Sequence, residues 1–169
     1  MTDRVDVVKK LLEPSRKIEA KHRIPHLFII AQALVETGWL KKAIGNNIFG
    51  IKANASWKGK KQLVTTTEYH DTPSEKYPEI ISITQQINGK YKYVVKDWFR
   101  DYDSIEECLE DHAAFLIKNK RYQKAFTTTN PYDFASEVAK AGYATDPNYV
   151  KILHAVMRNV ENIIKLNKL

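Results

Sequence analysis

The stretch IPHLFIIAQALVETGWL, residues 24–40, decides how the rest of the chain is interpreted. It is the most apolar run in the sequence, and its length and composition predict a helix of the protein core. Pro25 suits the first turn of this helix, and Gly38 suits its end. The run carries one acidic side chain, Glu36, although an ionised carboxylate is costly to bury. This single carboxylate needs an explanation.

The predicted helix places Glu36 on a face without obvious solvation, shared with Ile29, Gln32, Ala33 and Leu40. Apolar neighbours and the negative end of the helix dipole both raise the pKa of a carboxyl group there. A protonated carboxylic acid near neutral pH is what a general acid needs. The alternative is a structural Glu that pairs with Lys41 or Lys42, and local pattern alone favours that alternative because most unusual carboxylates are structural.

The flanking segments predict more helices. Apolar spacing, Pro14 and Pro25 indicate helices near residues 4–12, 14–22 and 25–38. Ser104 and Glu107 form a capping box for a helix through about Lys118. Two later helices begin at Asn130-Pro131, ending at Gly142, and at Asp146-Pro147.

The middle of the chain, from Gly45 to Tyr102, has a different pattern, with β-branched and aromatic runs broken by Gly, Pro and Asn. Ile80–Ile87 and Lys90–Phe99 flank Asn88-Gly89, which predicts a hairpin with a type I′ turn. The sequence therefore predicts an α+β, mainly α fold. A small β lobe, approximately residues 45–102, is inserted in a helical body, and residues 1–169 form a single domain. Trp39 and Trp98, beside apolar runs, are expected in the core.

Composition narrows the classes of protein. The chain has 169 residues and a formal net charge of +7, which favours polyanionic partners such as nucleic acid, anionic lipid or an acidic cell wall. The lysines are scattered and no nucleic-acid motif is present, so we expect no nucleic-acid binding. No apolar run is long enough to insert in a membrane. The five histidines lack zinc spacing, and Cys108, the one cysteine, fits a buried helix position, so we expect no metal or other cofactor.

Glycoside cleavage normally uses a second carboxylate beside the general acid. The β region offers six candidates, namely Glu68, Asp71, Glu75, Glu79, Asp97 and Asp101. Glu68 ends the likely strand TTTEYH, where strand alternation can point a side chain into a cleft between lobe and body. The residues alone do not select it.

Six stretches together resemble the bacterial and phage glucosaminidase family of flagellar and autolytic peptidoglycan hydrolases, glycoside hydrolase family 73. They are AQALVETGW (31–39), GNNIFGIK (45–52), TTTEY (65–69), WFRDYDS (98–104), DHAAFL…RY (111–122) and AGYATDPNYV (141–150). They keep the family's order over roughly residues 14–165. Leu40 departs from the pattern, since many members have Gly there.

The resemblance implies a lysozyme-like helical domain with a β lobe and a groove for a glycan strand between them. It implies that Glu36 is the catalytic acid, that Glu68 is the second carboxylate, and that Tyr143 lies near the catalytic centre. Glu68 then acts as a base toward water or stabilises positive charge; alternatively the substrate's N-acetyl group attacks, oriented by Tyr143. The spacing of the carboxylates, which separates these routes, is not readable from sequence.

Other residues are expected to bind the substrate. The aromatic residues Phe49, Trp57 and Tyr69 lie in or beside loops, where their rings could stack on sugars. Asn47 follows a turn glycine, so a role in the turn competes equally with sugar binding. Asp146, within AGYATDPNYV, completes the expected contacts.

The sequence thus predicts an endo-β-N-acetylglucosaminidase that cleaves peptidoglycan glycan strands after N-acetylglucosamine, as in a phage endolysin or autolysin. The alternatives are a muramidase on the same scaffold and a non-catalytic wall-binding or phage structural module. Anionic wall polymers are the further expected partner. The start, MTDRVDVVKKLLEP, is not a secretory signal peptide. Action on the bacterial wall is expected after release from a host cytoplasm by a membrane lesion, from a virion, or as an excised domain of a secreted protein.

Overall fold

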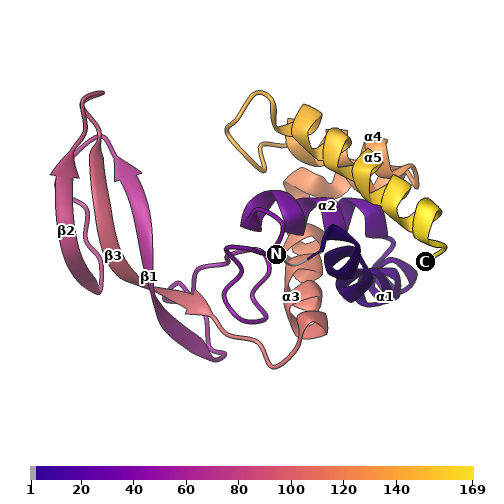
Figure 1. Ribbon diagram of the computed structural model, residues 1–169, viewed down its shortest axis with the longest axis horizontal. Coiled ribbons are helices and arrows are strands. Elements are labelled where there is room, and N and C mark those ends of the chain that lie inside the picture. Colours follow the sequence, from indigo (N-terminus) through magenta and orange to yellow (C-terminus); the bar gives the residue numbers. More distant parts are fainter. Residues whose placement is uncertain (1–2) are drawn as a thin grey trace. The chain divides into compact units, whose positions relative to one another are not determined.

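A computed structural model describes residues 3–169, which form two compact units (Figure 1). One unit is helical and comprises the described residues through Phe49 together with Tyr102–Leu169. The other comprises Gly50–Asp101 and carries a β-sheet. The α+β, mainly α fold class predicted from sequence is confirmed.

The helical unit is built around α2 (His26–Thr37), whose residues from Leu27 to Leu34 are all buried. A helix that is apolar on every side must be surrounded by protein. The helices α1 (Arg4–His22), α4 (Pro131–Lys140) and α5 (Tyr149–Asn167) pack against it. The unit is completed by α3 (Ile105–Lys118), which packs on α1, and by the short 3₁₀ segment η1 (Lys120–Thr127).

The sequence led us to expect that Pro14 separates two helices, but it does not. It lies inside α1, which runs without interruption from Arg4 to His22. A proline in a helix removes one hydrogen bond, to the carbonyl four residues earlier. That carbonyl belongs to Lys10, an exposed residue whose backbone oxygen water can solvate. Burial of Leu11, Leu12 and Ile18 on the same helix outweighs the loss.

The sheet unit has three antiparallel strands in the order β1-β3-β2. They are β1 (Lys61–His70), β2 (Glu79–Gln85) and β3 (Tyr91–Arg100). The central strand β3 buries Tyr93, Val95 and Phe99, whereas β2 is exposed along its whole length. The predicted β2–β3 hairpin is confirmed.

The turn of this hairpin differs from the prediction. Gly89 has a positive φ of 82°, but Asn88 does not, so the pair does not form a type I′ turn. Gln86 N instead bonds Lys90 O at 2.7 Å, and Gly89 N bonds Gln86 O at 2.9 Å. This is the three-residue loop in which a left-handed glycine closes the hairpin, and it needs only one residue with positive φ.

Two tryptophans expected in the core are partly exposed. The guanidinium of Arg4 lies 4.4 Å from the ring centroid of Trp39 in the helical unit. The Lys61 ammonium lies 4.4 Å from the ring of Trp98 in the sheet unit. Each ring has a cation over one face, a contact that is compatible with partial exposure. The apolar runs beside these residues therefore did not indicate how far they are buried. Cys108 is buried in α3, as expected.

Candidate active site

Glu36 lies in the last turn of α2, the most buried helix of the protein. Thr37 Oγ1 donates a hydrogen bond to Ala33 O at 2.6 Å, and Gly38 ends the helix with a φ of 57°. This left-handed closure lets Gly38 N–H bond Leu34 O. The Glu36 side chain reaches solvent while its helix remains in the core. Throughout residues 3–169 Glu36 has no ion-pair partner, so the predicted alternative of pairing with Lys41 or Lys42 is wrong.

A line of hydrogen bonds connects Glu36 to the core. Tyr149, the first residue of α5, places Oη 3.4 Å from Glu36 Oε1 and donates to it. Gln32, one helical turn before Glu36, donates from Nε2 to the same Tyr149 Oη at 3.1 Å. Gln32 is fully buried and Tyr149 is 6% exposed. The carboxyl group is therefore held from its buried side by α5.

The electrostatic environment of Glu36 favours the protonated form that a general acid needs. Partial burial raises the pKa of Glu36 above its ordinary value, and the hydrogen bond from Tyr149 opposes part of that rise. Burial also raises the pKa of Tyr149, so its hydroxyl keeps its proton and remains a donor. The rise at Glu36 has the direction expected from the sequence.

Tyr143 belongs to the same cluster but does not contact Glu36 directly. Its ring stacks on Tyr149, with centroids 5.9 Å apart and planes 12° apart. Its hydroxyl lies 3.5 Å from Nε2 of His112, which burial keeps neutral by lowering its pKa to about 3. The rings of Tyr122 and Phe115 surround the other sides of Tyr143. The structure thus brings Tyr143 and Glu36 together through Tyr149.

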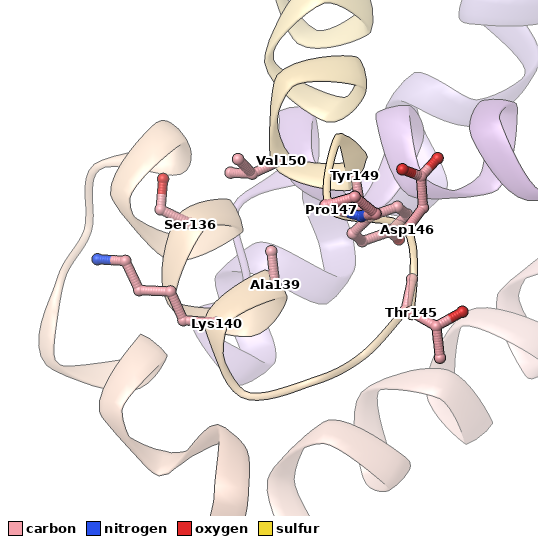
Figure 2. Close-up of a pocket in the computed structure, with 9 residues that line it drawn as sticks. Ser136, Ala139, Lys140, Thr145, Asp146, Pro147, Tyr149 and Val150 are labelled. Atoms are coloured by element: carbon pink, nitrogen blue, oxygen red, sulfur yellow. The ribbon is translucent and has the colours of Figure 1, made fainter.

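A cavity of about 340 Å³ lies beside this cluster, between α4 and the segment that leads into α5 (Figure 2). Asp146 and Tyr149 both line it, together with Ser136, Ala139, Lys140, Ala144, Thr145, Pro147 and Val150. Asp146 is exposed, and its Oδ1 accepts a hydrogen bond from Asn148 N at 2.8 Å. Asp146 therefore shapes the turn before α5 and lines the cavity as well.

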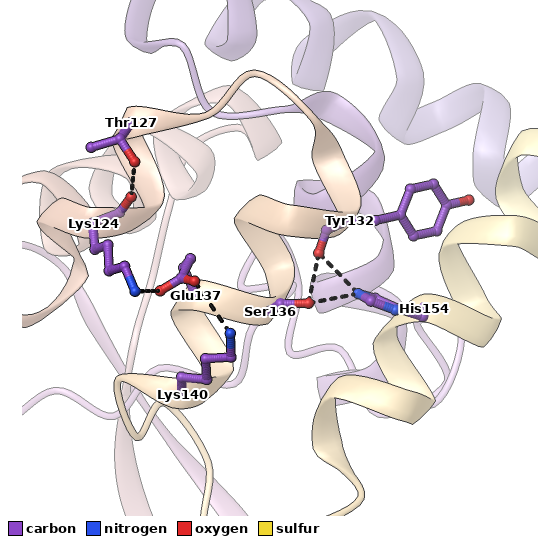
Figure 3. A network of polar contacts seen from close by, with 7 residues as sticks. All are labelled: Lys124, Thr127, Tyr132, Ser136, Glu137, Lys140 and His154. Atoms are coloured by element: carbon purple, nitrogen blue, oxygen red, sulfur yellow. Dashed lines mark hydrogen bonds and ion pairs between the residues drawn. The ribbon is translucent and has the colours of Figure 1, made fainter.

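Polar contacts hold the elements that position Tyr149 (Figure 3). His154 of α5 lies 2.9 Å from Tyr132 O and 3.2 Å from Ser136 Oγ, both on α4. Glu137 of α4 pairs with Lys124 of η1 at 3.3 Å. These contacts join α5, α4 and η1, so the start of α5 has defined neighbours.

Two expected sugar-binding residues have other positions. Phe49 is 6% exposed and stacks on His112 at 3.9 Å, so its ring packs in the core and offers almost no surface to a sugar. Asn47 is fully buried, and its backbone exchanges hydrogen bonds with Ile44 at 2.9 and 3.3 Å. Of the two roles left open for Asn47, its burial fits the role in the turn. Burial leaves little surface of either side chain for a sugar, which a loop-like sequence did not reveal, and direct sugar contact by these two residues stays a prediction.

Glu68 lies on β1 of the sheet unit, on the face of the strand that is more covered. Lys52 Nζ bridges two carboxylates there, at 2.8 Å from Glu68 and 3.0 Å from Asp97. Burial alone would lower the pKa of Lys52, but the two carboxylates raise it overall, so the ammonium stays charged. The same ammonium lies 5.7 Å from the ring of Tyr77. Glu68 thus belongs to a charged cluster rather than standing alone.

The remaining aromatic candidates also lie in the sheet unit. Tyr69 is 56% exposed and available for stacking. Trp57 donates from Nε1 to Lys60 O at 2.8 Å, and the Arg100 guanidinium lies 4.2 Å from its ring. One face of Trp57 is therefore already occupied by a cation.

Residues 3–169 contain no cluster of three or more His, Cys, Asp or Glu side chains that could hold a metal ion. Over the same residues no helix has the length and apolar character to cross a membrane.

Sequence reasoning missed Tyr149 and Gln32, the two residues bonded in line with Glu36. Both lie inside the family-like stretches, AGYATDPNYV and AQALVETGW. The position of Tyr149 in the first turn of an amphipathic helix was a usable signal. Sequence spacing alone, however, does not show whether Tyr149 or Tyr143, six residues earlier, bonds the carboxyl group.

Comparison with known proteins identifies relatives over most of the chain. The family model described as "Glucosaminidase: Mannosyl-glycoprotein endo-beta-N-acetylglucosaminidase" matches residues 13–162. The peptidoglycan hydrolase FlgJ of Salmonella typhimurium is 36% identical over 94% of this chain and 47% of its own length. A probable N-acetylmuramidase of Lactococcus lactis is 30% identical over 76% of this chain and 27% of its own length.

Solved structures are similar to the fold of this chain. A C-terminally truncated glycoside hydrolase domain of Salmonella typhimurium FlgJ superimposes with a TM-score of 0.75 at 35% identity. That match covers 95% of this chain and 99% of the solved domain. The chain spans about half the length of the FlgJ protein it matches. With a family model matched over residues 13–162, the chain belongs to the glucosaminidase family of glycoside hydrolases.

Proposed function

We propose that residues 1–169 form one catalytic domain that hydrolyses peptidoglycan at the β-1,4 bond after N-acetylglucosamine, acting as an endo-β-N-acetylglucosaminidase. The observation that carries the proposal is Glu36: a carboxyl group at the end of a buried helix, bonded by Tyr149 and with a raised pKa. Such a group can hold a proton near neutral pH and deliver it to a leaving oxygen.

In this proposal Glu36 protonates the glycosidic oxygen, and positive charge develops at the anomeric carbon of the cleaved sugar. Glu68 is the second carboxylate, as a base toward water or as an electrostatic stabiliser. Tyr143 orients the acetamido group of the N-acetylated sugar. Asp146, Tyr69 and Trp57 contact the glycan, and the exposure of Asp146 and Tyr69 supports this contact.

Peptidoglycan is supported as the substrate by the similarity to FlgJ, a peptidoglycan hydrolase. The net charge of +7 adds attraction to anionic wall polymers. The biological setting we propose is wall degradation by a phage endolysin or an autolysin.

Digestion of purified peptidoglycan tests the proposal. Borohydride reduction followed by mass spectrometry identifies the sugar at each new reducing end. Reduced N-acetylglucosamine on products of several lengths is expected. Intact peptidoglycan after incubation with folded protein would contradict a catalytic function and leave a non-catalytic wall-binding module.

A muramidase is the second candidate, favoured by the 30% identity to a probable N-acetylmuramidase. Both wall sugars carry an acetamido group, so Tyr143 does not separate the two activities. The lactyl-peptide arm of muramic acid does, since the subsite for the cleaved sugar must either exclude or accept it. Reduced muramic acid at the new ends would assign the muramidase activity.

A further inference from the structure

Gln32, Tyr149 and Glu36 form a continuous line of hydrogen bonds that ends at the proposed acid. We propose that Gln32 is a positioning residue whose amide sets the direction of the Tyr149 hydroxyl proton and keeps the line bonded in both protonation states of Glu36. The inference rests on the proposed role of Glu36 as the acid. It adds a residue that touches no substrate.

The observed geometry provides the hydrogen bonds that the ionised state of Glu36 needs. A tyrosine hydroxyl has one hydrogen to donate. Because Gln32 Nε2 donates to Tyr149 Oη at 3.1 Å, that oxygen acts as an acceptor on its buried side. The single hydroxyl hydrogen is then directed to Glu36 Oε1 at 3.4 Å. Because this hydrogen bond stabilises the carboxylate, the carboxyl group of Glu36 loses its proton more readily.

When Glu36 is protonated, the hydrogen bonds along the line must run in the opposite direction. A carboxylic acid donates its own hydrogen, and Tyr149 Oη is the acceptor already in place. The Tyr149 hydroxyl then requires an acceptor on its buried side. Gln32 Oε1 is buried and receives no hydrogen bond from any residue in the range 3–169. Rotation of the amide by half a turn presents this oxygen to Tyr149 and satisfies it.

An amide is suited to this position because it carries a donor and an acceptor on one rotatable group. An aliphatic side chain of similar size would remove the partner on the buried side of the hydroxyl, and when Glu36 is protonated the hydroxyl hydrogen would then have no acceptor there, which is costly. A general acid loses and regains its proton in each catalytic cycle. The line therefore matches the demand that the reaction places on Glu36.

The other ionisable side chains near this line do not replace it. Tyr143 stacks its ring on Tyr149, and Tyr122 acts on Tyr149 through its electrostatic field. His112 lies behind Tyr143 and is neutral. Burial raises the pKa of Tyr143, so its hydroxyl stays protonated. Glu36 is therefore the group at the end of the line whose change of charge the line must accommodate.

A substrate-free NMR titration tests the line. Glutamate labelled with ¹³C at the carboxyl reports the protonation of Glu36, and the ¹⁵N side-chain amide resonances report Gln32. The Gln32 amide is expected to shift with the same midpoint as Glu36. Tyr149→Phe should abolish that shift, whereas Tyr143→Phe, which removes the neighbouring hydroxyl and keeps the stacked ring, should preserve it. A Gln32 amide that does not titrate, or that still titrates in Tyr149→Phe, overturns the inference.

Kinetics provide the second readout. Gln32→Met should lower kcat about tenfold, the net effect of one lost hydrogen bond, and leave KM unchanged. Leu34→Met, a substitution at a buried apolar position of the same helix, should leave kcat unchanged. Equal loss in both variants would mean that Gln32 acts only through packing. If the wild-type protein cleaves no peptidoglycan, the proposed function fails, and the titration still decides whether the line exists.

Discussion

Tyr149 and Glu36 face each other where α5 begins and α2 ends, with 3.4 Å between Oη and Oε1. The contact joins residues 113 positions apart in the chain. It lets a buried, neutral tyrosine hold one oxygen of the carboxyl group while the rest of that group reaches solvent. The contact identifies Tyr149, rather than Tyr143, as the tyrosine directly bonded to the proposed acid.

Glu36→Gln should lower the rate of peptidoglycan cleavage by several orders of magnitude because an amide has no acidic proton to deliver to the leaving oxygen. The variant keeps the size of the side chain, so the fold should be unchanged by circular dichroism. Release of reducing ends from purified peptidoglycan measures the effect. Near-normal release by folded Glu36→Gln would assign the acid to another residue.

The same variant should change how stability depends on pH. The pKa of Glu36 is raised in the folded protein, so between the unfolded and folded values the folded state binds more protons. Unfolding free energy contributed by Glu36 therefore falls as pH rises through that window and stays lower above it. Glu36→Gln should be more stable relative to wild type at pH 7 than at pH 3.5, measured by urea unfolding at both pH values. An unchanged difference would contradict the raised pKa.

Glu68→Gln should reduce turnover strongly, though less than Glu36→Gln if the substrate's acetamido group assists. Glu79→Gln is a matched control, because Glu79 also pairs with a lysine of the sheet, Lys96, at 2.9 Å. Added azide sharpens the measurement: a glycosyl azide of inverted configuration would support a carboxylate partner at Glu68. Wild-type activity in Glu68→Ala would transfer the role to another carboxylate such as Asp97, which shares Lys52.

The sequence predicted the elements of the fold where a local signal is strong. The apolar run of α2, the Ser104 cap of α3 and the β2–β3 hairpin all appear in the structure. Of the two errors, the first reflects tertiary burial that outweighs local preference, and the second reflects the choice between two local types of hairpin loop. Pro14 is tolerated because its helix is held by buried leucines, and Asn88-Gly89 closes a three-residue loop rather than a two-residue turn.

The site was predictable only in part. An acidic residue at the end of an apolar helix is unusual, but the local pattern favoured a structural role, and Glu36 was selected as the acid through the resemblance of AQALVETGW to the glucosaminidase family. The hydrogen bond from Tyr149 could not be predicted, since it depends on how α5 packs against α2. The burial of Phe49 could not be predicted either, since it depends on a ring contact with His112 on α3. Spacing along the chain contains no information about such contacts between distant segments.

Tyr143→Phe should slow cleavage about tenfold without changing which sugar carries the new reducing end, because the phenol is proposed to hold an acetamido group rather than to choose between wall sugars. The ring stack on Tyr149 is retained in this variant. Rate and product analysis on the same digest measure both effects. A switch of the reducing sugar would give Tyr143 a role in specificity instead.

Gly38→Ala should weaken the protein and the reaction together, because Gly38 has a φ of 57° immediately after the helix that carries Glu36. A Cβ there would meet no atom within 4 Å, so the cost is backbone strain alone. An alanine in the left-handed region costs roughly 1 kcal/mol, which for a domain of this size lowers Tm by about 2–4 °C.

Gly45→Ala is the matched control for this last effect. Gly45 belongs to the same unit, has a φ of 58°, and likewise has no atom within 4 Å of an added Cβ. Both variants should lose similar stability in thermal unfolding. Only Gly38→Ala should also lower kcat several-fold at temperatures well below Tm, since relief of its strain displaces the last turn of α2 and lengthens the Glu36–Tyr149 contact. Equal kcat in the two variants would show that the left-handed closure serves stability and does not position the acid.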